Sequence, residues 1–306
     1  MTSRNLSKTK PGREAGFLVH CVRMPNHHPL AVLPKGEQWS ILAHGLLVFF
    51  VTGGLALAAG ARTIVQGGYV PSAAVSVPYV LALILFATAL LLFALRAFKN
   101  PVVFEALFAL SMLAGSWFLA DLYFSPGLAL ALGSSVILLR FLWKSVLMAN
   151  AALVVGIAGI SASLALKMSP LAMLALLTML SFYDILAVYR TKHMVKMFRD
   201  LSSHGVVFAF TLPPLSPKAL FSTASAERRG MLLGTGDIAL PVMFALSALR
   251  NGPVQAVAAL AGAALGYALM FMFFIAQPRR APIPALPPIA LGSMLAYVFS
   301  LLIFPS

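Results

Sequence analysis

The chain has 306 residues, of which 60% are hydrophobic and 10% are charged, and its mean hydropathy is +0.93. Soluble domains carry about 45–50% apolar and about 25% charged residues, so this composition excludes a water-soluble fold. The net charge of +14 does not indicate nucleic-acid binding, because the basic residues are scattered through short connections between apolar runs. A single cysteine, Cys21, excludes a disulfide framework and a cysteine-cluster metal site.

The N-terminal segment 1–39 is polar, basic and proline-containing. It lacks the apolar core of a signal peptide, so we expect a disordered cytoplasmic arm. Met24 is an alternative to Met1 as the physiological start.

The remaining sequence predicts an all-α membrane protein, a polytopic bundle of nine transmembrane helices. A helix needs about 20 largely apolar residues to cross the hydrocarbon core. Helices one to six fall within 40–189, a cytoplasmic loop covers 190–230, and helices seven to nine fall within 231–306. The predicted spans are 40–61, 76–95, 102–120, 125–142, 145–166, 170–189, 231–249, 253–275 and 283–303.

The basic residues predict the orientation of the bundle. Of the 22 Lys and Arg residues, all but Arg62, Lys167 and Arg250 lie on one side of the predicted membrane, in the N-terminal arm and in 96–99, 140–144, 190–230 and 279–280. Since Lys and Arg accumulate on the cytoplasmic side, the N-terminus and the 190–230 loop are predicted to be cytoplasmic and the C-terminus outside.

Two carboxyl groups are predicted to lie inside the membrane. Glu105 and Asp121 are near opposite ends of the third span, where interfacial solvation explains them. Asp184 and Asp237 instead lie within apolar spans, with no basic residue at i±3 or i±4. An unpaired acid at such a position costs at least about 2.5–3.5 kcal/mol, so a cavity or a function is expected there.

The two acids have similar predicted depths. Asp184 precedes Arg190 by six residues, about 9 Å at helical rise, and Asp237 follows Arg229 by eight, about 12 Å. The two spans are consecutive and antiparallel, so the acids can face each other. Small residues precede Asp237 in the run 234–237, Gly-Thr-Gly-Asp, and Pro241 removes a helical hydrogen bond to the Asp237 carbonyl.

A close carboxyl pair is suited to peptide-bond hydrolysis. Two neighbouring carboxyl groups cannot both ionise cheaply, so one keeps its proton and the pair supplies a general base and a general acid together. The base activates water, and the acid hydrogen-bonds the carbonyl oxygen and helps protonate the leaving amine. This chemistry needs no metal and no cofactor.

Other chemistries fit the sequence less well. Among the histidines, His44, His193 and His204 are isolated, and no H-E-x-x-H zinc motif is present. The serines within the spans have no histidine partner at the same depth. The serious alternative is a proton- or cation-coupled transporter or channel, because intramembrane acids commonly carry ions.

Three short motifs resemble the presenilin and signal-peptide-peptidase family of intramembrane aspartyl proteases. Tyr183-Asp184 looks like the family's YD motif, 234–237 looks like GxGD, and 284–286 looks like PAL. The motifs occur in the family's order on predicted spans six, seven and nine. The run 183–194 looks especially like the archaeal presenilin homologues. A cytoplasmic 190–230 loop matches the presenilin orientation, whereas signal peptide peptidases face the other way.

The resemblance implies roles for the matching positions. Asp184 and Asp237 would be the catalytic pair, supported by Tyr183 and by Gly234 and Gly236. Substrate would bind at Pro284, Ala285 and Leu286. The implied substrates are transmembrane helices of other proteins, cut within or near the lipid bilayer. The sequence indicates a multi-pass protein of the cell membrane, with no nucleic acid and no obligate partner subunit.

Overall fold

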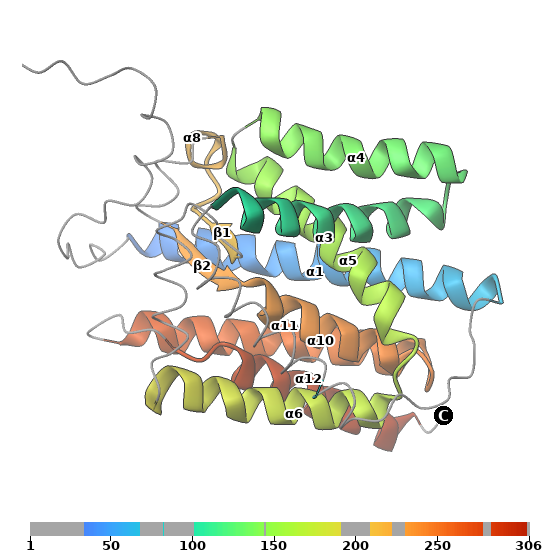
Figure 1. The fold of residues 1–306 in the computed structure, drawn as a ribbon. Coiled ribbons are helices and arrows are strands. Elements are labelled where there is room, and N and C mark those ends of the chain that lie inside the picture. Colours follow the sequence, from blue (N-terminus) through green and yellow to red (C-terminus); the bar gives the residue numbers. More distant parts are fainter. Residues whose placement is uncertain are drawn as a thin grey trace, which may run out of the picture.

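A computed structural model describes residues 34–67, 82, 101–143, 145–190, 209–221, 230–277 and 283–304, and the following description concerns these residues. Long helices lie roughly side by side, and a small pair of strands lies at one end of the bundle (Figure 1). The last helix, Leu286–Ile303, ends at the opposite end of the bundle (Figure 1). The chain is therefore mostly helical, as its sequence predicts.

Five of the described helices are long and apolar enough to cross a membrane. They are α1 (Lys35–Val65), α5 (Val146–Ala165), α6 (Pro170–Ile185) with its π-helical continuation η1 (Leu186–Arg190), α11 (Pro253–Ala276) and α12 (Leu286–Ile303). The other helices are α3 (Pro101–Asp121), α4 (Pro126–Leu142), the short α8 (Pro217–Leu220) and α10 (Thr235–Ala248).

Each predicted span except 76–95 coincides with a described helix, and 76–95 lies outside the described residues apart from residue 82. Residues 1–33 of the predicted arm also lie outside them. Local sequence explains several helix starts. Pro126, Pro170 and Pro253 occupy first turns, where a missing N–H costs nothing. The Ser145 and Ser169 hydroxyls cap α5 and α6 by accepting backbone N–H groups.

Two predicted boundaries are wrong at this end of the bundle. α1 begins at Lys35, so the last residues of the predicted arm are helical. The seventh span begins as a strand: β2 (Met231–Gly234) pairs antiparallel with β1 (Ala209–Leu212), and α10 starts only at Thr235. The 190–230 segment therefore contains a strand and the helix α8. A short apolar run is compatible with strand or helix, and the partner strand decides it here.

Helix α10 lies at the centre of the fold. It packs against α1, α5, α6, α11 and α12. Its side chains Ile238, Val242, Phe244, Ala245, Leu246 and Ala248 are completely buried. Glycines allow close approach elsewhere, at Gly262 and Gly292 between α11 and α12 and at Gly115 and Gly159 between α3 and α5. Because α10 is held on several sides, its first turn has a fixed position.

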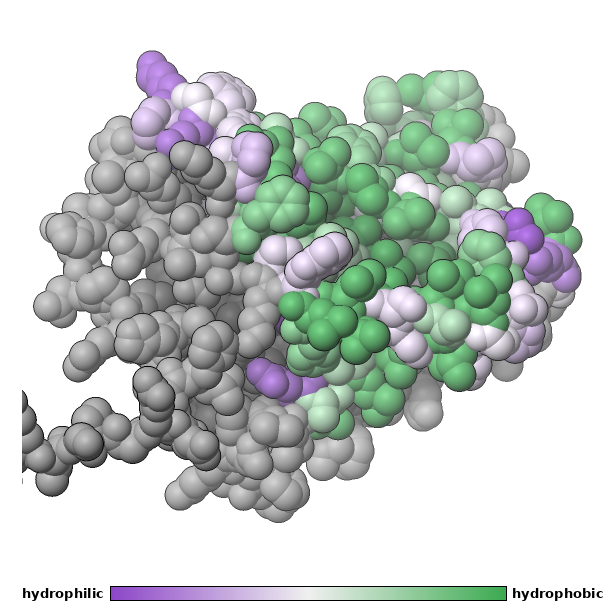
Figure 2. All heavy atoms as spheres, turned by 90° about the horizontal axis from the view of Figure 1, so that it is seen from above, coloured by the Kyte–Doolittle hydropathy of each residue, from purple (hydrophilic) through white to green (hydrophobic). Residues whose placement is uncertain are grey.

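Large apolar side chains cover much of the outside of the bundle. Leu110, Leu138 and Leu265 are each about 60% exposed or more. Figure 2 shows one such face, where hydrophobic residues dominate the described surface. A surface of this kind is suited to lipid rather than water, and the protein is an integral membrane protein.

Candidate active site

Asp184 lies in the last turn of α6, two residues before the first residue of the π-helical segment 186–190. Its side chain is 8% exposed. The backbone N–H of Leu286 donates a hydrogen bond of 3.3 Å to Asp184 Oδ2. π-Helical turns inside α-helices are frequent at functional sites. The carboxyl group is therefore buried and held by the start of α12.

Asp237 is the third residue of α10, and Gly234 is the residue that precedes the helix. The backbone N–H of Gly234 hydrogen-bonds the Asp237 carboxyl group. An acid at this position commonly reaches back in this way, and a helix N-terminus favours a carboxylate. A Cβ at Gly234 would lie 2.9 Å from Asp237 Oδ2, so the glycine leaves room for the carboxyl group.

The two acids lie on neighbouring helices. Helices α6 and α10 pack against each other, and Asp184 lies within electrostatic range of Asp237. The predicted depth of Asp237 needs correction, because it assumed helical rise through 231–234. Those residues form a strand, which rises about 3.3 Å per residue instead of 1.5 Å.

The 284–286 motif lies at the same end of the bundle. Pro284 and Leu286 are buried and Ala285 is half-buried. Residues 283–285 are not helical. Helix α12 begins at Leu286, although a proline follows directly. The reason is that Pro287 occupies the first helical turn, where proline is tolerated.

The remaining predicted support residues are less enclosed. Tyr183 lies on α6, and 47% of the residue is exposed. Gly236 is exposed, and a Cβ there would meet no atom of the described residues within 4 Å. Gly234 is the glycine whose missing side chain the acid requires.

Three polar side chains for which the sequence predicts no role in the site hold the segment 211–215. The Asn150 amide donates to the Thr211 carbonyl (2.7 Å) and accepts from the Thr211 N–H (3.2 Å). His44 Nδ1 donates to the carbonyl of Pro213 (3.0 Å). Ser40 Oγ accepts from the backbone N–H of residue 215 (2.7 Å). We call Ser40, His44 and Asn150 the strand clamp. Asn150 and His44 are polar residues inside apolar spans, and that signal was present in the sequence.

The other acids of the third span have ordinary environments. Asp121 is exposed at the end of α3. Glu105 is half-buried and lies within electrostatic range of Arg140 on α4. Among the described residues there is no group of three or more His, Cys, Asp or Glu that could hold a metal ion.

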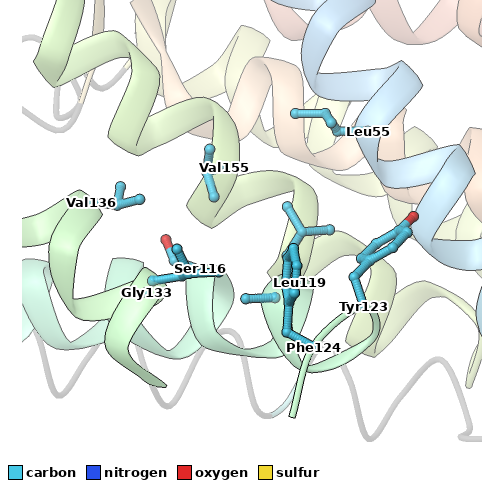
Figure 3. Close-up of a pocket in the computed structure, with 10 residues that line it drawn as sticks. Leu55, Ser116, Leu119, Tyr123, Phe124, Gly133, Val136 and Val155 are labelled. Atoms are coloured by element: carbon cyan, nitrogen blue, oxygen red, sulfur yellow. The ribbon is translucent and has the colours of Figure 1, made fainter. Parts of the chain in front are cut away.

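A cavity of about 230 Å³ lies elsewhere, among α1, α3, α4 and α5 (Figure 3). Its lining is almost entirely apolar, and none of the candidate site residues contributes to it. Its lining residues are Leu55, Ser116, Leu119, Ala120, Tyr123, Phe124, Leu132, Gly133, Val136 and Val155. The acids and this cavity are separate features.

The family of the chain follows from its sequence. Residues 62–305 match the family model described as signal-peptide peptidase, presenilin aspartyl protease. The chain belongs to this family. The protein is therefore an intramembrane aspartyl protease, and the expected resemblance is confirmed at the level of the family. No curated protein sequence matches it significantly.

Two solved structures share the fold of this family member. Both are described as a presenilin family intramembrane aspartate protease, one in space group C222 and one in P2. Their TM-scores are 0.62 and 0.59, and each is 19% identical in sequence. The alignments cover 86% and 84% of this chain and 99% and 96% of theirs. The closer likeness to archaeal homologues stays a prediction.

Proposed function

We propose that Asp184 and Asp237 are the catalytic pair of this aspartyl protease. One carboxylate removes a proton from water as the water attacks the peptide carbonyl. The protonated partner hydrogen-bonds the carbonyl oxygen and then helps to protonate the leaving amine. The observation that carries the proposal is that two acids from different helices lie within electrostatic range, each accepting a backbone N–H.

Pro284, Ala285 and Leu286 bind the substrate beside the acids in this proposal. The hydrogen bond from Leu286 to Asp184 supports it, because that contact brings the motif to the carboxyl group. The non-helical backbone at 283–285 offers groups that an unwound substrate segment can pair with, as in strand addition. Tyr183, Gly234 and Gly236 are proposed as supporting residues, of which Gly234 has the clearest structural reason.

We also propose a nine-helix topology with the N-terminus and 190–230 in the cytoplasm and the C-terminus outside. Residues 1–39, of which 35–39 are helical, precede the first span, and 76–95 is the second. The acids then lie near the cytoplasmic edge, and water reaches them from that side. The distribution of Lys and Arg supports this orientation, and the orientation determines the side from which water enters.

The proposed substrates are single transmembrane helices of other proteins in the cell membrane, without an obligate partner subunit. A transporter or channel using the same acids is the alternative. It would move ions and leave peptides intact, so the products distinguish the two functions.

The test is peptide cleavage by the purified full-length protein in detergent, where no ion gradient exists. Mass spectrometry of a panel of transmembrane peptides should reveal cut products. Asp184→Ala and Asp237→Ala should each abolish the products, because each removes half of the base–acid pair. Asp121→Ala is the control, and it should retain activity because Asp121 is exposed at the end of α3. Full activity of Asp237→Ala would refute the proposed dyad.

A further inference from the structure

We propose that Asn150 is a positioning residue for Asp237. It fixes the register of β1 against β2, and that register leaves the Gly234 N–H free to hold the acid. The proposal rests on the function proposed for Asp237 and adds a residue on a helix that carries no catalytic motif.

Asn150 takes the place of a neighbouring strand at the outer edge of β1. It lies in the first turns of α5 and is 4% exposed. Its amide donates to the Thr211 carbonyl and accepts from the Thr211 N–H, so it bonds both backbone groups of one residue. An adjacent strand would bond an edge residue in the same two ways. A buried side-chain amide with both groups satisfied is a specific contact rather than general packing.

The register follows from this contact. Both backbone groups of Thr211 point away from β2, so Thr211 and its partner Leu232 form a non-hydrogen-bonded pair. Such pairs alternate with hydrogen-bonded ones along an antiparallel ladder. The next non-hydrogen-bonded pair is then Ala209 with Gly234.

This alternation determines what the Gly234 N–H can do. In a non-hydrogen-bonded pair, the Gly234 N–H points away from β1, and the Asp237 carboxyl group accepts it. A slip by one residue would turn the Gly234 N–H towards β1 and take it away from the acid. Asn150 opposes such a slip because its amide holds both the N–H and the carbonyl of Thr211.

The rest of the strand clamp reinforces the same segment. His44 and Ser40 on α1 hold the backbone of residues 213 and 215. β1 is therefore fixed from α1 and α5, while β2 continues directly into α10. The path from Asn150 to the acid is short: Asn150 to Thr211, across the strand pair to β2, and from Gly234 to Asp237.

The first test compares two substitutions on α5. Asn150→Ala should lower kcat by at least tenfold, with KM changed less than twofold, because the acid loses its fixed donor. Ser161→Ala is the matched control: Ser161 is also buried on α5, and its hydroxyl has no hydrogen-bond partner among the residues that the structure describes. It should stay within twofold of the wild-type kcat. In Asn150→Ala, hydrogen exchange should rise at 209–212 and stay unchanged in α11.

Asn150→Asp supplies a readout that a merely structural role would not give. A protonated Asp carries one donor and one acceptor, like Asn, whereas a carboxylate carries acceptors only. The activity of Asn150→Asp relative to wild type should therefore rise at least fivefold from pH 8 to pH 5, while the relative activity of Asn150→Ala stays flat. The comparison of Asn150→Asp with wild type remains informative if Asn150→Ala fails to fold.

The outcomes separate this proposal from the proposed dyad. Loss of activity in Asp237→Ala together with wild-type kcat in Asn150→Ala would overturn the positioning role and leave the dyad intact. A flat relative pH profile for Asn150→Asp would also overturn it. Activity in Asp237→Ala would instead overturn the dyad itself.

Discussion

The backbone N–H of Leu286 donates to Oδ2 of Asp184, although the two residues are 102 positions apart in the chain. Leu286 is the first residue of α12, and the N–H groups of a first turn have no partner within their helix. The next two residues, Pro287 and Pro288, have no N–H to offer. Of the first three residues of α12, Leu286 alone can therefore donate to the acid.

Substitutions of Leu286 should separate the contribution of its packing to stability from the contribution of its position beside Asp184 to activity. Leu286 is 4% exposed, so an Arg there would bury a charge, and milder changes are more informative. Leu286→Met should cost less than about 1.5 kcal/mol and keep activity near wild type. Leu286→Ala should cost about 2–5 kcal/mol and lower kcat about tenfold, because the start of α12 shifts against Asp184. Thermal unfolding and peptide cleavage in detergent measure both effects.

The control for Leu286→Ala is Leu260→Ala on α11. Leu260 is 6% exposed and packs against Gly53 on α1. The Leu260→Ala variant should lose a similar amount of stability and keep its kcat within twofold of wild type. An equal loss of kcat in both variants would mean that Leu286 contributes only to the core.

The two glycines of the 234–237 motif should respond differently to alanine. A Cβ at Gly234 would lie 2.9 Å from Asp237 Oδ2, so Gly234→Ala should rotate the carboxyl group and lower kcat about tenfold or more. Gly236→Ala should lower kcat less, because its Cβ would meet none of the described atoms within 4 Å. Cleavage rates at saturating peptide check this, with circular dichroism to confirm the helices. The reverse order of effects would contradict the placement of the acid.

The sequence singles out the two acids because a carboxyl group inside an apolar span is energetically costly. Asp184 and Asp237 stand out for that reason alone. The helices were equally predictable from their length and hydropathy. The strand at Met231–Gly234 was not, because those four residues suit helix and strand alike and their partner, Ala209–Leu212, lies far earlier in the chain.

The contacts that position the site residues could not be predicted from the sequence either. Asn150 is polar within an apolar span, but its partner is the backbone of Thr211, and backbone groups carry no sequence signal. The same holds for His44 and Pro213. Periodicity identifies the residues that face the interior, whereas the pairing of side chains with distant backbone requires the fold.

The orientation of the bundle should be visible with reporters. A reporter fused after Ser306 should read extracytoplasmic, and one inserted near Ser216 should read cytoplasmic, because Lys and Arg accumulate on the cytoplasmic side. Ser216 precedes α8, at the end of the bundle where the strands lie (Figure 1). A reporter fused after Lys167, in the short connection between α5 and α6, is the control and should agree with Ser306. Opposite readings at all three positions would reverse the topology and place the acids near the outer edge.

Substrate helix stability should control the cleavage rate. A transmembrane helix keeps its peptide bonds within its own hydrogen-bond ladder, since lipid offers no other partners. A segment must therefore unwind before its carbonyl can reach Asp184 and Asp237. Gly in a helix interior costs about 1 kcal/mol relative to Ala, so two Gly residues near the cut should raise the cleavage rate about tenfold or more. Poly-Leu of the same length should resist cleavage.

The measurement is the initial rate for a matched peptide series, with cut positions assigned by mass spectrometry. Peptides with the same two Gly residues placed far from the cut are the control, because they weaken the helix without exposing the scissile bond. Their rates should stay close to that of the parent peptide. Equal rates across the whole series would show that unwinding at the cut does not limit the reaction. A rate that follows local helix stability would instead mean that the site acts on an extended segment, consistent with the non-helical backbone at 283–285 beside Asp184.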